Sequence, residues 1–423
     1  MYFSNKDLKL QVIYNISIYL TQLVLKFISF FNQKLKLGVL GRKDAFKILE
    51  THISQTDKTF WFHCASLGEY EQGLPVFKEL RKTHPSHKIV LTFFSPSGYE
   101  IRKNTDIADV VVYLPLDTKA NAKRFLDLVH PELTIFVKYD IWPNILIELK
   151  KRHLKAILIS ALFRENQIYF KFYGGFMKKA LFAFQHIFTQ DESSKDLLKT
   201  IDYNHVTVSG DTRFDRVFSQ LEQNNHLGFI EQFKGDKLCF VAGSTWPEDE
   251  AFLVEYINSL ETNTIKFIIA PHNIKATQIK KLKQSINKKT VLFTEKDLST
   301  ISSHQVLILD TIGLLTKVYS YANLAYVGGA VGKTGLHNTL EPAVFGIPII
   351  IGENYNKFPE AKFMIKNQGM FTIKNTKELT QTIDNLRNSP KSIKTAGEAN
   401  LNYIKNNRGA VIQILSFIRT YED

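Results

Sequence analysis

Two acidic residues each follow a short apolar run that predicts a β-strand. Glu69 lies in FWFHCASLGEYEQGLPV (Phe60–Val76), where the predicted strand leads through a tight loop into a helix. Asp140 lies in VKYDIWPNIL (Val137–Leu146), which has the same order of elements. Because ligands bind at the carboxyl ends of the strands in a doubly wound sheet, we expect both carboxylates at a ligand site. A carboxylate placed there can act as the general base that takes a proton from an attacking hydroxyl.

Both acidic positions also suit the start of a helix, and position alone leaves that alternative open. Glu69 could stabilise the helix dipole, and a helix amino terminus favours the ionised carboxylate, which weakens it as a base. Proton transfer would then be late and concerted with departure of the leaving group. Asp140 could be an N-cap, because Pro143 suits the first turn of the helix that follows.

A glycine-rich stretch, YVGGAVGKTGLHNTLEPAVFGIP, covers Tyr326–Pro348. Its centre, Gly332–Thr334, matches the end of the phosphate-binding loop GxxxxGK[ST], which needs its first glycine at position 327. That residue is Val327, so the pattern argues against an ATPase. The stretch instead predicts a strand, a glycine-rich loop and a helix that opens near His337–Asn338, where backbone N–H groups attract phosphate.

Four residues of this stretch are candidates for nucleotide binding. Gly328 and Gly329 let the backbone approach a ligand closely. Asn338 and Glu341 lie on one face of the expected first turn, where Asn338 could bond a phosphate or a base and Glu341 could accept ribose hydroxyls. The structural alternative is that Asn338 caps the helix and Glu341 completes a capping pair.

The elements that must position these residues alternate along the chain from Thr59 onward. Fourteen short apolar runs read as strands: TFWFHCA, KIVLTFF, DVVVYLP, LTIFVKY, KAILISA, HIFTQ, HVTVSG, KLCFVAGS, IKFIIAPH, TVLFTE, QVLILD, LAYVGGA, IPIIIG and GMFTI. Helical patterns between them predict parallel sheets covered by helices. The polar stretch Gly210–Phe229 separates two such series. We therefore predict an α/β protein with two doubly wound Rossmann-like domains facing across a cleft, the GT-B outline, which an epimerase or a two-domain binding protein could share.

The length of 423 residues also favours two domains over a single core. The expected divisions are an anchor helix and basic segment (1–43), an acceptor-binding α/β domain (44–210), a linker (211–229), a nucleotide-sugar-binding α/β domain (230–389) and terminal helices that pack back towards the first domain (390–423). Neither half has a good GxGxxG after its first strand, which argues against a dinucleotide dehydrogenase.

The net charge of +13 favours anionic partners. Residues 1–43 contain seven Lys or Arg and one Asp, so this segment carries a large share of the charge. The chain has no arginine-rich stripe or nucleic-acid motif, so we expect no nucleic-acid partner. Cys64 and Cys239 are the only cysteines and are far apart in sequence. They predict neither a disulfide framework nor a metal cluster, and favour a reducing compartment.

The amino-terminal segment Leu10–Phe31 has the spacing of an amphipathic helix. Its polar face would carry Gln11, Asn15, Gln22, Lys26, Ser29 and Gln33, and its apolar face Ile13, Ile16, Leu20, Leu23, Phe27 and Phe31. With the basic stretch KLKLGVLGRK after it, this helix could lie in or tilt into a membrane whose anionic headgroups meet the lysines. The alternative is a helix packed on the protein's own core. No small-residue cleavage site follows the apolar part, which argues against a cleavable signal peptide.

Together these stretches resemble the 3-deoxy-D-manno-octulosonic acid (Kdo) transferases, which add Kdo to the lipid A precursor. The resemblance covers nearly the whole chain. HCASLGE is similar to the family's H-A-x-S-x-G-E, DIWPN to E-[IL]-W-P-N, and GDTRFD to G-N-x-K-F-D. The amino-terminal GRK, the stretch GSTWPEDE and the long pattern GGxxxxxGxHNxLEPAxFGxP, which begins at Gly328, complete it.

The resemblance implies a GT-B glycosyltransferase of lipopolysaccharide core biosynthesis on the cytoplasmic face of the inner membrane. Its donor would be CMP-Kdo and its acceptor the phosphorylated lipid A precursor (lipid IVA), with inversion at the anomeric centre and no metal or cofactor. Glu69 matches the catalytic base. The acceptor-side candidates are Ser66, Gly68, Lys138 and Asp140, and the donor-side candidates are Ser244, Thr245, His272, Gly328, Gly329, His337, Asn338 and Glu341.

The sequence departs from the family's pattern at a few positions. Lys138 stands where the family often has an acid, and Asp140 where it has Glu. APHN replaces the P-R-H-P-E-R of many members, so an expected arginine after His272 is missing. Lys138, Lys333 and Arg213 are candidate partners for anionic ligand groups. The rival functions are another GT-B transferase that uses a UDP-sugar with a lipid-linked acceptor, and a non-catalytic membrane-associated GT-B-like protein.

Overall fold

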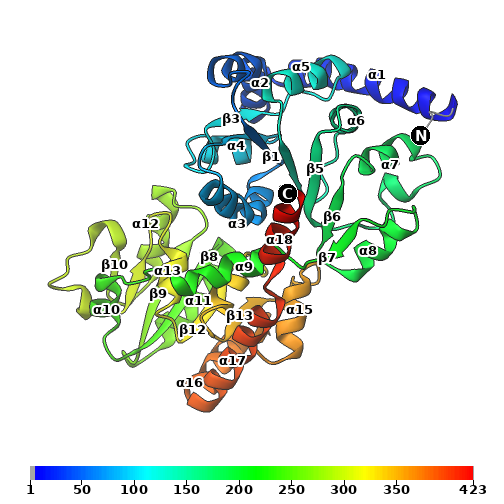
Figure 1. Ribbon diagram of the computed structural model, residues 1–423. Coiled ribbons are helices and arrows are strands. Elements are labelled where there is room, and N and C mark those ends of the chain that lie inside the picture. Colours follow the sequence, from blue (N-terminus) through cyan, green and yellow to red (C-terminus); the bar gives the residue numbers. More distant parts are fainter. Residues whose placement is uncertain (1–4, 423) are drawn as a thin grey trace. The chain divides into compact units, whose positions relative to one another are not determined.

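The computed structural model describes the backbone of residues 5–422, which form two compact units (Figure 1). The first unit runs to Arg216 and also includes the chain from Arg408 onward, and the second unit is Val217–Asn407. The boundary at Arg216 falls within the polar stretch expected to link the domains. Each of the fourteen apolar runs forms a strand, and the strands make two parallel sheets of seven. The prediction of two doubly wound α/β domains is confirmed.

The sheet of the first unit has the strand order β3-β2-β1-β4-β5-β6-β7. Its strands are β1 (Thr59–Cys64), β2 (Lys88–Phe93), β3 (Val110–Tyr113), β4 (Leu133–Val137), β5 (Lys155–Ala161), β6 (His186–Thr189) and β7 (Val206–Val208). All residues of β1 are buried, as expected for a parallel strand covered on both faces. Trp61 packs into the core on one face, while Phe60 and Phe62 pack into the core on the other.

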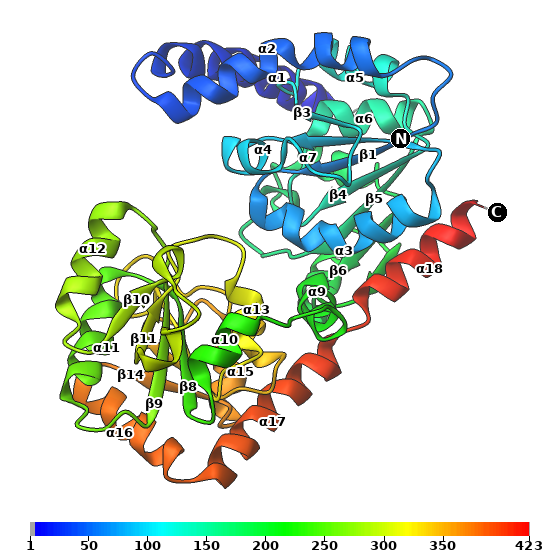
Figure 2. The same ribbon diagram turned by 90° about the vertical axis from the view of Figure 1, so that its left-hand side faces the viewer.

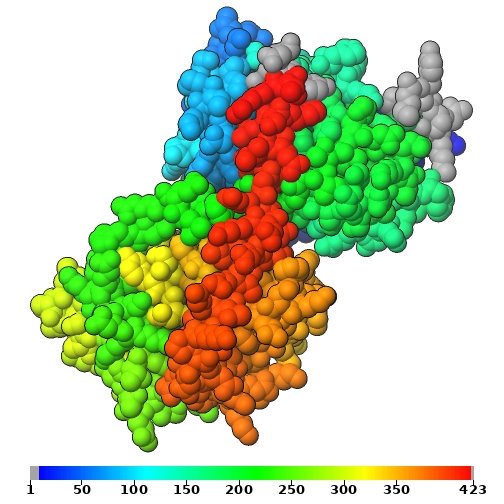
Figure 3. Space-filling view, turned by 60° about the horizontal axis from the view of Figure 1, so that its bottom comes forward, coloured from blue at the N-terminus to red at the C-terminus, as the bar shows by residue number. Residues whose placement is uncertain are grey.

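Helices cover both faces of this sheet. They are α3 (Leu67–Thr83), α4 (Pro96–Arg102), α5 (Lys119–Val129), α6 (Pro143–Lys151), α7 (Gly175–Leu181), α8 (Glu192–Lys199), α9 (Thr212–Phe218), which crosses the unit boundary, and α18 (Ala410–Glu422), with a 3-10 turn at Ile168–Phe170. The last helix belongs to this unit because Ile414 and Ile418 are buried in the same core as Phe60. Figure 3 shows α18 in red lying across the surface of the first unit.

The sheet of the second unit has the order β10-β11-β9-β8-β12-β13-β14. Its strands are β8 (Leu238–Thr245), β9 (Ile265–Pro271), β10 (Thr290–Leu292), β11 (Val306–Ile308), β12 (Leu324–Val327), β13 (Ile349–Gly352) and β14 (Met370–Ile373). Its helices are α10 (Gly228–Lys234), α11 (Pro247–Ser259), α12 (Ala276–Ser285), α13 (Leu315–Tyr319), α14 (Leu340–Ala343), α15 (Pro359–Lys366), α16 (Thr376–Arg387) and α17 (Pro390–Asn407), with 3-10 turns at Ser219–Glu222, Phe293–Glu295 and Ile301–Ser303.

The range 390–423, which the sequence suggests as one terminal segment, is divided between the units. The side chain of Asn400, on α17, donates to the carbonyls of Ile347 (2.8 Å) and Gly369 (2.7 Å), and all three residues lie in the second unit. Only α18 joins the first unit, because its apolar face completes the core against β1 and β4.

Two helices precede the first sheet, α1 (Asn5–Ile28) and α2 (Gln33–His52). Figures 1 and 2 show them in blue, over the same end of the first unit as α5 and α6. The α1 helix is turned with its apolar side outward: Leu23 is 65% exposed and Phe27 66%, while Gln11, on the polar side, is 9% exposed. Within residues 5–422, Lys9–Ile28 is the one helical stretch long and apolar enough to cross a membrane by length and composition. The alternative of a helix packed on the protein's own core is met only in part: α1 contacts the first unit through its other side, and its apolar face stays exposed.

Each sheet has one place where the strand order reverses. In the first sheet this switch point lies between β1 and β4, and in the second between β8 and β12. The loops that follow the two strands at a switch point diverge to opposite faces, and the crevice between them is where doubly wound sheets bind ligands. Glu69 and Asp140 follow β1 and β4, while Ser244 ends β8 and the glycine-rich stretch follows β12.

Candidate functional site

At the first switch point, Glu69 lies in the first turn of α3 and its side chain turns back towards the strand end. Its Oε2 accepts a hydrogen bond from the backbone N–H of Ala65, and the residue is only 7% exposed. Burial raises the pKa of Glu69, and the negative charge of Asp140 raises it further. His63, the Ala65 bond and Lys138 act in the opposite direction but do not cancel these effects.

The sequence-based expectation for the charge of Glu69 is therefore corrected. A helix amino terminus by itself favours the ionised form and weakens the base. Here the loss of solvation outweighs that effect, because a buried carboxylate loses more stabilising interaction with water than the helix end returns. A carboxylate with a raised pKa is a better proton acceptor once ionised, which is the property a general base near neutral pH needs.

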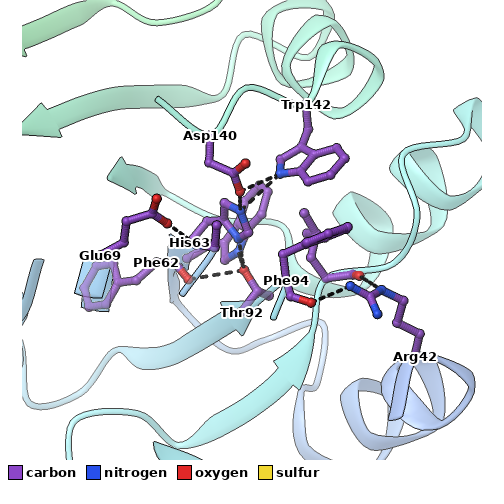
Figure 4. A network of polar contacts seen from close by, with 11 residues as sticks. Arg42, Phe62, His63, Glu69, Thr92, Phe94, Asp140 and Trp142 are labelled. Carbon is purple, nitrogen blue, oxygen red and sulfur yellow. Dashed lines mark hydrogen bonds and ion pairs between the residues drawn. The ribbon is translucent and has the colours of Figure 1, made fainter. Parts of the chain in front are cut away.

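Asp140 lies beside the buried imidazole of His63 (Figure 4). Its Oδ2 is 2.6 Å from His63 Nε2 and accepts a hydrogen bond of 2.8 Å from Trp142 Nε1. On the other side of the ring, His63 Nδ1 is 2.8 Å from the hydroxyl of Thr92, which itself accepts the indole N–H of Trp61 at 2.8 Å.

Both ring nitrogens of His63 have polar partners. The Thr92 hydroxyl lies within reach of His63 Nδ1 and of the Phe62 carbonyl, 3.4 Å away. At Nε2, both Asp140 Oδ2 and Trp142 Nε1 (3.2 Å) approach the ring, and Nε2 donates to Asp140 in the tautomer that carries its proton there. His63 therefore fixes the orientation of the Asp140 carboxylate, as a histidine fixes its partner in other acid–imidazole pairs.

Asp140 is not the N-cap of α6, so that alternative is wrong. Trp142 occupies the N-cap position, and the cap interactions come from Asp117, whose two carboxylate oxygens accept the backbone N–H groups of Asn144 and Ile145, each at 2.9 Å. Because Asp117 serves the helix end, the Asp140 side chain is available to pair with His63 and Trp142.

The other acceptor-side candidates surround Glu69 in the same unit. Lys138 is half-buried with a φ of 73°, a left-handed conformation that is strained for a residue with a side chain. Ser66 is at the N-cap position of α3, yet its hydroxyl caps no backbone N–H of the described chain. A Cβ added to Gly68 would meet only Ser66 Oγ, at 3.9 Å, so the space above this turn is open.

At the second switch point, Ser244 and Thr245 end β8. Ser244 has a φ of 53°, a second strained position at a strand end. Thr245 is buried, and its hydroxyl donates to Glu250 Oε1 at 3.0 Å. The Thr245 hydroxyl is therefore engaged within the protein, whereas Ser244 is half-buried.

The glycines after β12 are closely packed against other atoms of the protein, and a side chain at either position would collide with them. A Cβ at Gly328 would collide with the carbonyl oxygen of Ser244, and Gly329 has a φ of 95°. The N–H of Gly329 donates to Asp249 Oδ2 at 2.9 Å. Asp249 also accepts the Trp246 N–H (2.9 Å) and the Tyr326 hydroxyl (2.7 Å), so it joins α11 to β12.

Three rings gather beside the glycine-rich stretch. Trp246 Nε1 donates to His337 Nε2 at 2.9 Å, and the ring of His272 lies 4.7 Å from that of Trp246 and 4.5 Å from that of His337. Burial and the neighbouring His272 lower the pKa of His337 to about 4, and burial lowers the pKa of His272. His337 is therefore neutral at pH 7 and carries its proton on Nδ1.

Asn338 and Glu341 bond to each other. Asn338 Nδ2 donates to Glu341 Oε1 at 3.0 Å, and Asn338 Oδ1 accepts the N–H of Leu340 at 3.2 Å. The helix α14 begins at Leu340 and is a single turn with Thr339 as N-cap, so the predicted opening at His337–Asn338 is wrong. The predicted capping pair is present in altered form: the Asn338 side chain accepts the N–H of Leu340 and donates to Glu341, while Thr339 at the N-cap position makes no side-chain cap bond.

The remaining charged candidates are an arginine in an ion pair and an exposed lysine. Arg213 Nε is paired with Asp211 Oδ2 at 2.7 Å, and Lys333 is exposed. Among the described residues, no group of three or more His, Cys, Asp or Glu side chains is arranged to hold a metal ion. Cys64 and Cys239 are free thiols, both buried.

Several site residues were not among the candidates drawn from the sequence. His63 stands within HCASLGE, but its role became visible only when β1 and the loop after β4 were adjacent. Thr92 was signalled only as a polar residue inside the apolar run KIVLTFF. Asp249 lies two positions after Pro247, the first residue of α11. An acidic residue at this position of a helix that begins with proline is a capping signal, so the sequence pattern could have indicated Asp249.

Known proteins resemble this chain in sequence and in fold. The family described as 3-deoxy-D-manno-octulosonic-acid transferase (kdotransferase) matches residues 40–216, which lie in the first unit. A 3-deoxy-D-manno-octulosonic acid transferase of Haemophilus influenzae is 28% identical over 85% of this chain and 86% of its own length. The enzyme of the same name from Aquifex aeolicus is 29% identical over 79% of this chain and 87% of its own length.

The fold is also found in solved structures. The UDP-GlcNAc 2-epimerase of Neisseria meningitidis, solved with UDP-GlcNAc, superposes with a TM-score of 0.60 and 15% identity, covering 86% of this chain and all of that one. At this identity the likeness concerns the fold alone, which is the GT-B arrangement of two parallel-sheet domains. The sequence matches carry the likeness further: over most of its length this chain is similar to Kdo transferases, which are glycosyltransferases.

Proposed function

We propose that the protein transfers Kdo from CMP-Kdo to a hydroxyl of the phosphorylated lipid A precursor, lipid IVA, with inversion and without a metal ion. The single observation that supports this most is Glu69, a buried carboxylate with a raised pKa at the switch point of the first sheet. Glu69 takes the proton of the attacking hydroxyl while that oxygen bonds to the anomeric carbon of Kdo. The bond from that carbon to the CMP phosphate breaks, and CMP leaves with the electron pair.

Asp140 orients the acceptor sugar in this proposal. Its Oδ2 is occupied by His63 and Trp142, while within the described chain Oδ1 has no hydrogen-bond partner. The side chain is 20% exposed, so Oδ1 can accept a hydroxyl of the acceptor. The contacts with His63 and Trp142 keep the carboxylate from rotating, so less ordering is required when the acceptor binds. Lys138 supplies a positive charge near Glu69 for an anionic group of a ligand.

The second unit binds the nucleotide part of the donor. Asn338 and Glu341 are half-buried side chains, with Glu341 accepting ribose hydroxyls and Asn338 bonding the phosphate or the base. Ser244, at the end of β8, faces the phosphate. Trp246, His272 and His337 present neutral rings at pH 7, so they contact the donor by hydrogen bonding and stacking rather than by charge.

A transfer assay tests the proposed reaction. Purified protein is incubated with CMP-Kdo and a tetraacylated, phosphorylated lipid A precursor, and the lipid products are read by mass spectrometry. We expect a mass gain of whole Kdo residues, release of CMP, and the same rate with a chelator present. Transfer from UDP-GlcNAc and none from CMP-Kdo would contradict the proposal, as would full loss of activity on chelation.

We also propose that α1 holds the enzyme on the cytoplasmic face of the inner membrane. Its apolar face is directed away from the protein, with Leu23 and Phe27 about two-thirds exposed (65% and 66%), and the segment 1–43 is strongly basic. An exposed apolar face next to cations is the pattern of an interfacial helix on anionic lipid. The buried free thiols Cys64 and Cys239 suit a reducing compartment.

Vesicle flotation tests this attachment. The protein should float with phosphatidylglycerol vesicles at low salt and bind less to vesicles of neutral lipid. A Leu23→Glu, Phe27→Glu variant should lose binding to both, because the charges face the membrane and not the protein. Equal binding of this variant and the unmodified chain would overturn the attachment through α1.

A further inference from the structure

Two side chains of the helix α1, Tyr14 and Asn15, form hydrogen bonds with the rest of the first unit. The Tyr14 hydroxyl donates to Asp117 Oδ2 at 2.8 Å, and Asn15 Oδ1 accepts from Asn144 Nδ2 at 2.9 Å. Tyr14 also packs against Phe176 of α7, with ring centres 5.4 Å apart. Tyr14 and Asn15 are half-buried against the first unit while Leu23 and Phe27 are exposed, so membrane contact through the exposed face leaves these bonds in place.

Asp117 is the point at which α1 meets the start of α6. It is 3% exposed, and besides Tyr14 it accepts the backbone N–H groups of Asn144 (Oδ2, 2.9 Å) and Ile145 (Oδ1, 2.9 Å). Its backbone carbonyl also accepts Asn144 Nδ2 at 2.5 Å. Burial raises the pKa of Asp117 to about 6, and the bonds from Asn144, Tyr14 and Ile145 counteract part of that rise. Every one of these donors therefore helps to keep a costly buried carboxylate ionised.

The start of α6 is continuous with the loop that carries Asp140. Asp140 lies three residues before Pro143, the first residue of α6, and Trp142 directly precedes it and donates to Asp140 Oδ2 at 2.8 Å. Trp142 is further held against Phe94, with ring centres 4.7 Å apart. A shift of the first turn of α6 would therefore move the indole that orients Asp140.

We propose that Tyr14 and Asn15 are positioning residues for acceptor transfer: by holding Asp117 and Asn144, the membrane helix sets the first turn of α6 and with it the Asp140 loop. The attachment of α1 to the protein is thereby coupled to the orientation of the Asp140 carboxylate. The inference rests on the proposed role of Asp140. It adds that the amino-terminal helix contributes to the geometry of the site as well as to membrane attachment.

The test compares Tyr14→Phe with Tyr19→Phe. Both changes remove one phenol hydroxyl from α1, but Tyr19 is 53% exposed, whereas the Tyr14 hydroxyl bonds to the buried Asp117. We expect Tyr14→Phe to lower kcat/KM for the lipid acceptor about tenfold, the scale of one lost hydrogen bond to a charged group, with the KM for CMP-Kdo unchanged. Tyr19→Phe should behave as the unmodified protein. Asn15→Ala, which removes the second contact, should show a smaller loss of the same kind.

Amide hydrogen exchange supplies a readout that does not depend on catalysis. The N–H groups of Asn144 and Ile145 bond to Asp117, so their exchange should speed up in Tyr14→Phe and Asn15→Ala but not in Tyr19→Phe. Vesicle flotation of all variants should be unchanged, because the apolar face is intact. If the unmodified protein transfers no Kdo, the proposed function fails while the exchange result still decides the coupling.

Two outcomes would overturn the coupling. One is acceptor kinetics and amide exchange in Tyr14→Phe equal to those of the unmodified protein. The other is a loss of activity that follows loss of vesicle binding while exchange at Asn144 and Ile145 stays the same. If Tyr14→Phe does not fold, Asn15→Ala decides by the same two measurements, since it removes a contact at the edge of the buried carboxylate and leaves the Tyr14 bond in place.

Discussion

The two switch points of this protein have the same topology and opposite chemical character. At the first switch point, the end of β1 and the loops after β1 and β4 bring together two carboxylates, a buried imidazole and a half-buried lysine. At the second, the loops after β8 and β12 and the loop after the neighbouring β9 bring together strained backbone, adjoining glycines and two imidazoles whose pKa values are lowered. The strand order thus places a site in each unit, and the residues at these strand ends decide what each site can do.

Burial has a different consequence for the acidic residue at each site. Glu69 is buried with few donors, so its pKa rises and it becomes a proton acceptor. Asp249 is buried in the second unit as well, and burial raises its pKa too, but it accepts three hydrogen bonds and serves as a structural joint between α11 and β12. A buried acid with a single backbone donor is therefore the better candidate for chemistry than one whose oxygens are fully used.

The largest expected effect comes from removing the base of the first site. Glu69→Gln should lower the transfer rate by roughly 10²–10⁴-fold, the usual contribution of a general base. Above pH 7, the Glu69→Gln variant should be at least as stable as the unmodified protein. Burial raises the pKa of Glu69, so the unmodified protein loses folding stability as the pH rises through that pKa. Transfer kinetics and thermal unfolding measure the two effects. Glu79→Gln, at the other end of α3, is the matched control and should transfer normally.

A smaller effect is expected at the second site. Asn338→Ala removes the bond to Glu341 and a proposed contact to the donor, so the KM for CMP-Kdo should rise about tenfold. The kcat at saturating CMP-Kdo should change little, since the base lies in the other unit. Steady-state kinetics with varied donor measure this. A fall in kcat with unchanged KM would mean that Asn338 belongs to the chemical step and that the two sites are not divided as proposed.

The smallest effect concerns the pH dependence of the second site. His337 has a pKa lowered to about 4, so between its unfolded value near 6.5 and pH 4 the unfolded chain binds a proton that the folded chain does not. Stability should fall as the pH decreases through this window, by less than about 1.4 kcal/mol per pH unit because the ring is partly solvated. Urea unfolding at pH 7 and pH 5 measures it. His337→Gln should reduce the fall, and an unchanged fall would assign it to other groups.

Much of the fold follows from local patterns in the sequence. The fourteen strands are short apolar runs bounded by polar turns, and the order of strand and helix dictates parallel sheets. The placement of Glu69 and Asp140 at one edge follows from the same rule, because each comes directly after a strand. The pattern GGxxxxxGxHNxLEP could be assigned to a loop and helix start for the same reason.

The details of the site depend on contacts between distant residues, which local patterns do not contain. His63 and Asp140 are 77 positions apart, and Asp117 caps a helix 27 positions later. The direction of the Glu69 pKa shift depends on burial by the completed fold, so its position in a helix alone predicts the wrong sign. The spacing of α1 shows two faces, but only the partners of Tyr14 and Asn15 show that the polar face is turned inward.

The division of labour between the two units has one direct test, a calorimetric titration of CMP into the unmodified protein, Glu69→Gln and Asn338→Ala. We expect the dissociation constant of CMP to be the same for the unmodified protein and Glu69→Gln, and about tenfold weaker for Asn338→Ala. Weakened CMP binding in Glu69→Gln together with normal binding in Asn338→Ala would contradict the assignment of base and nucleotide site to different sheets.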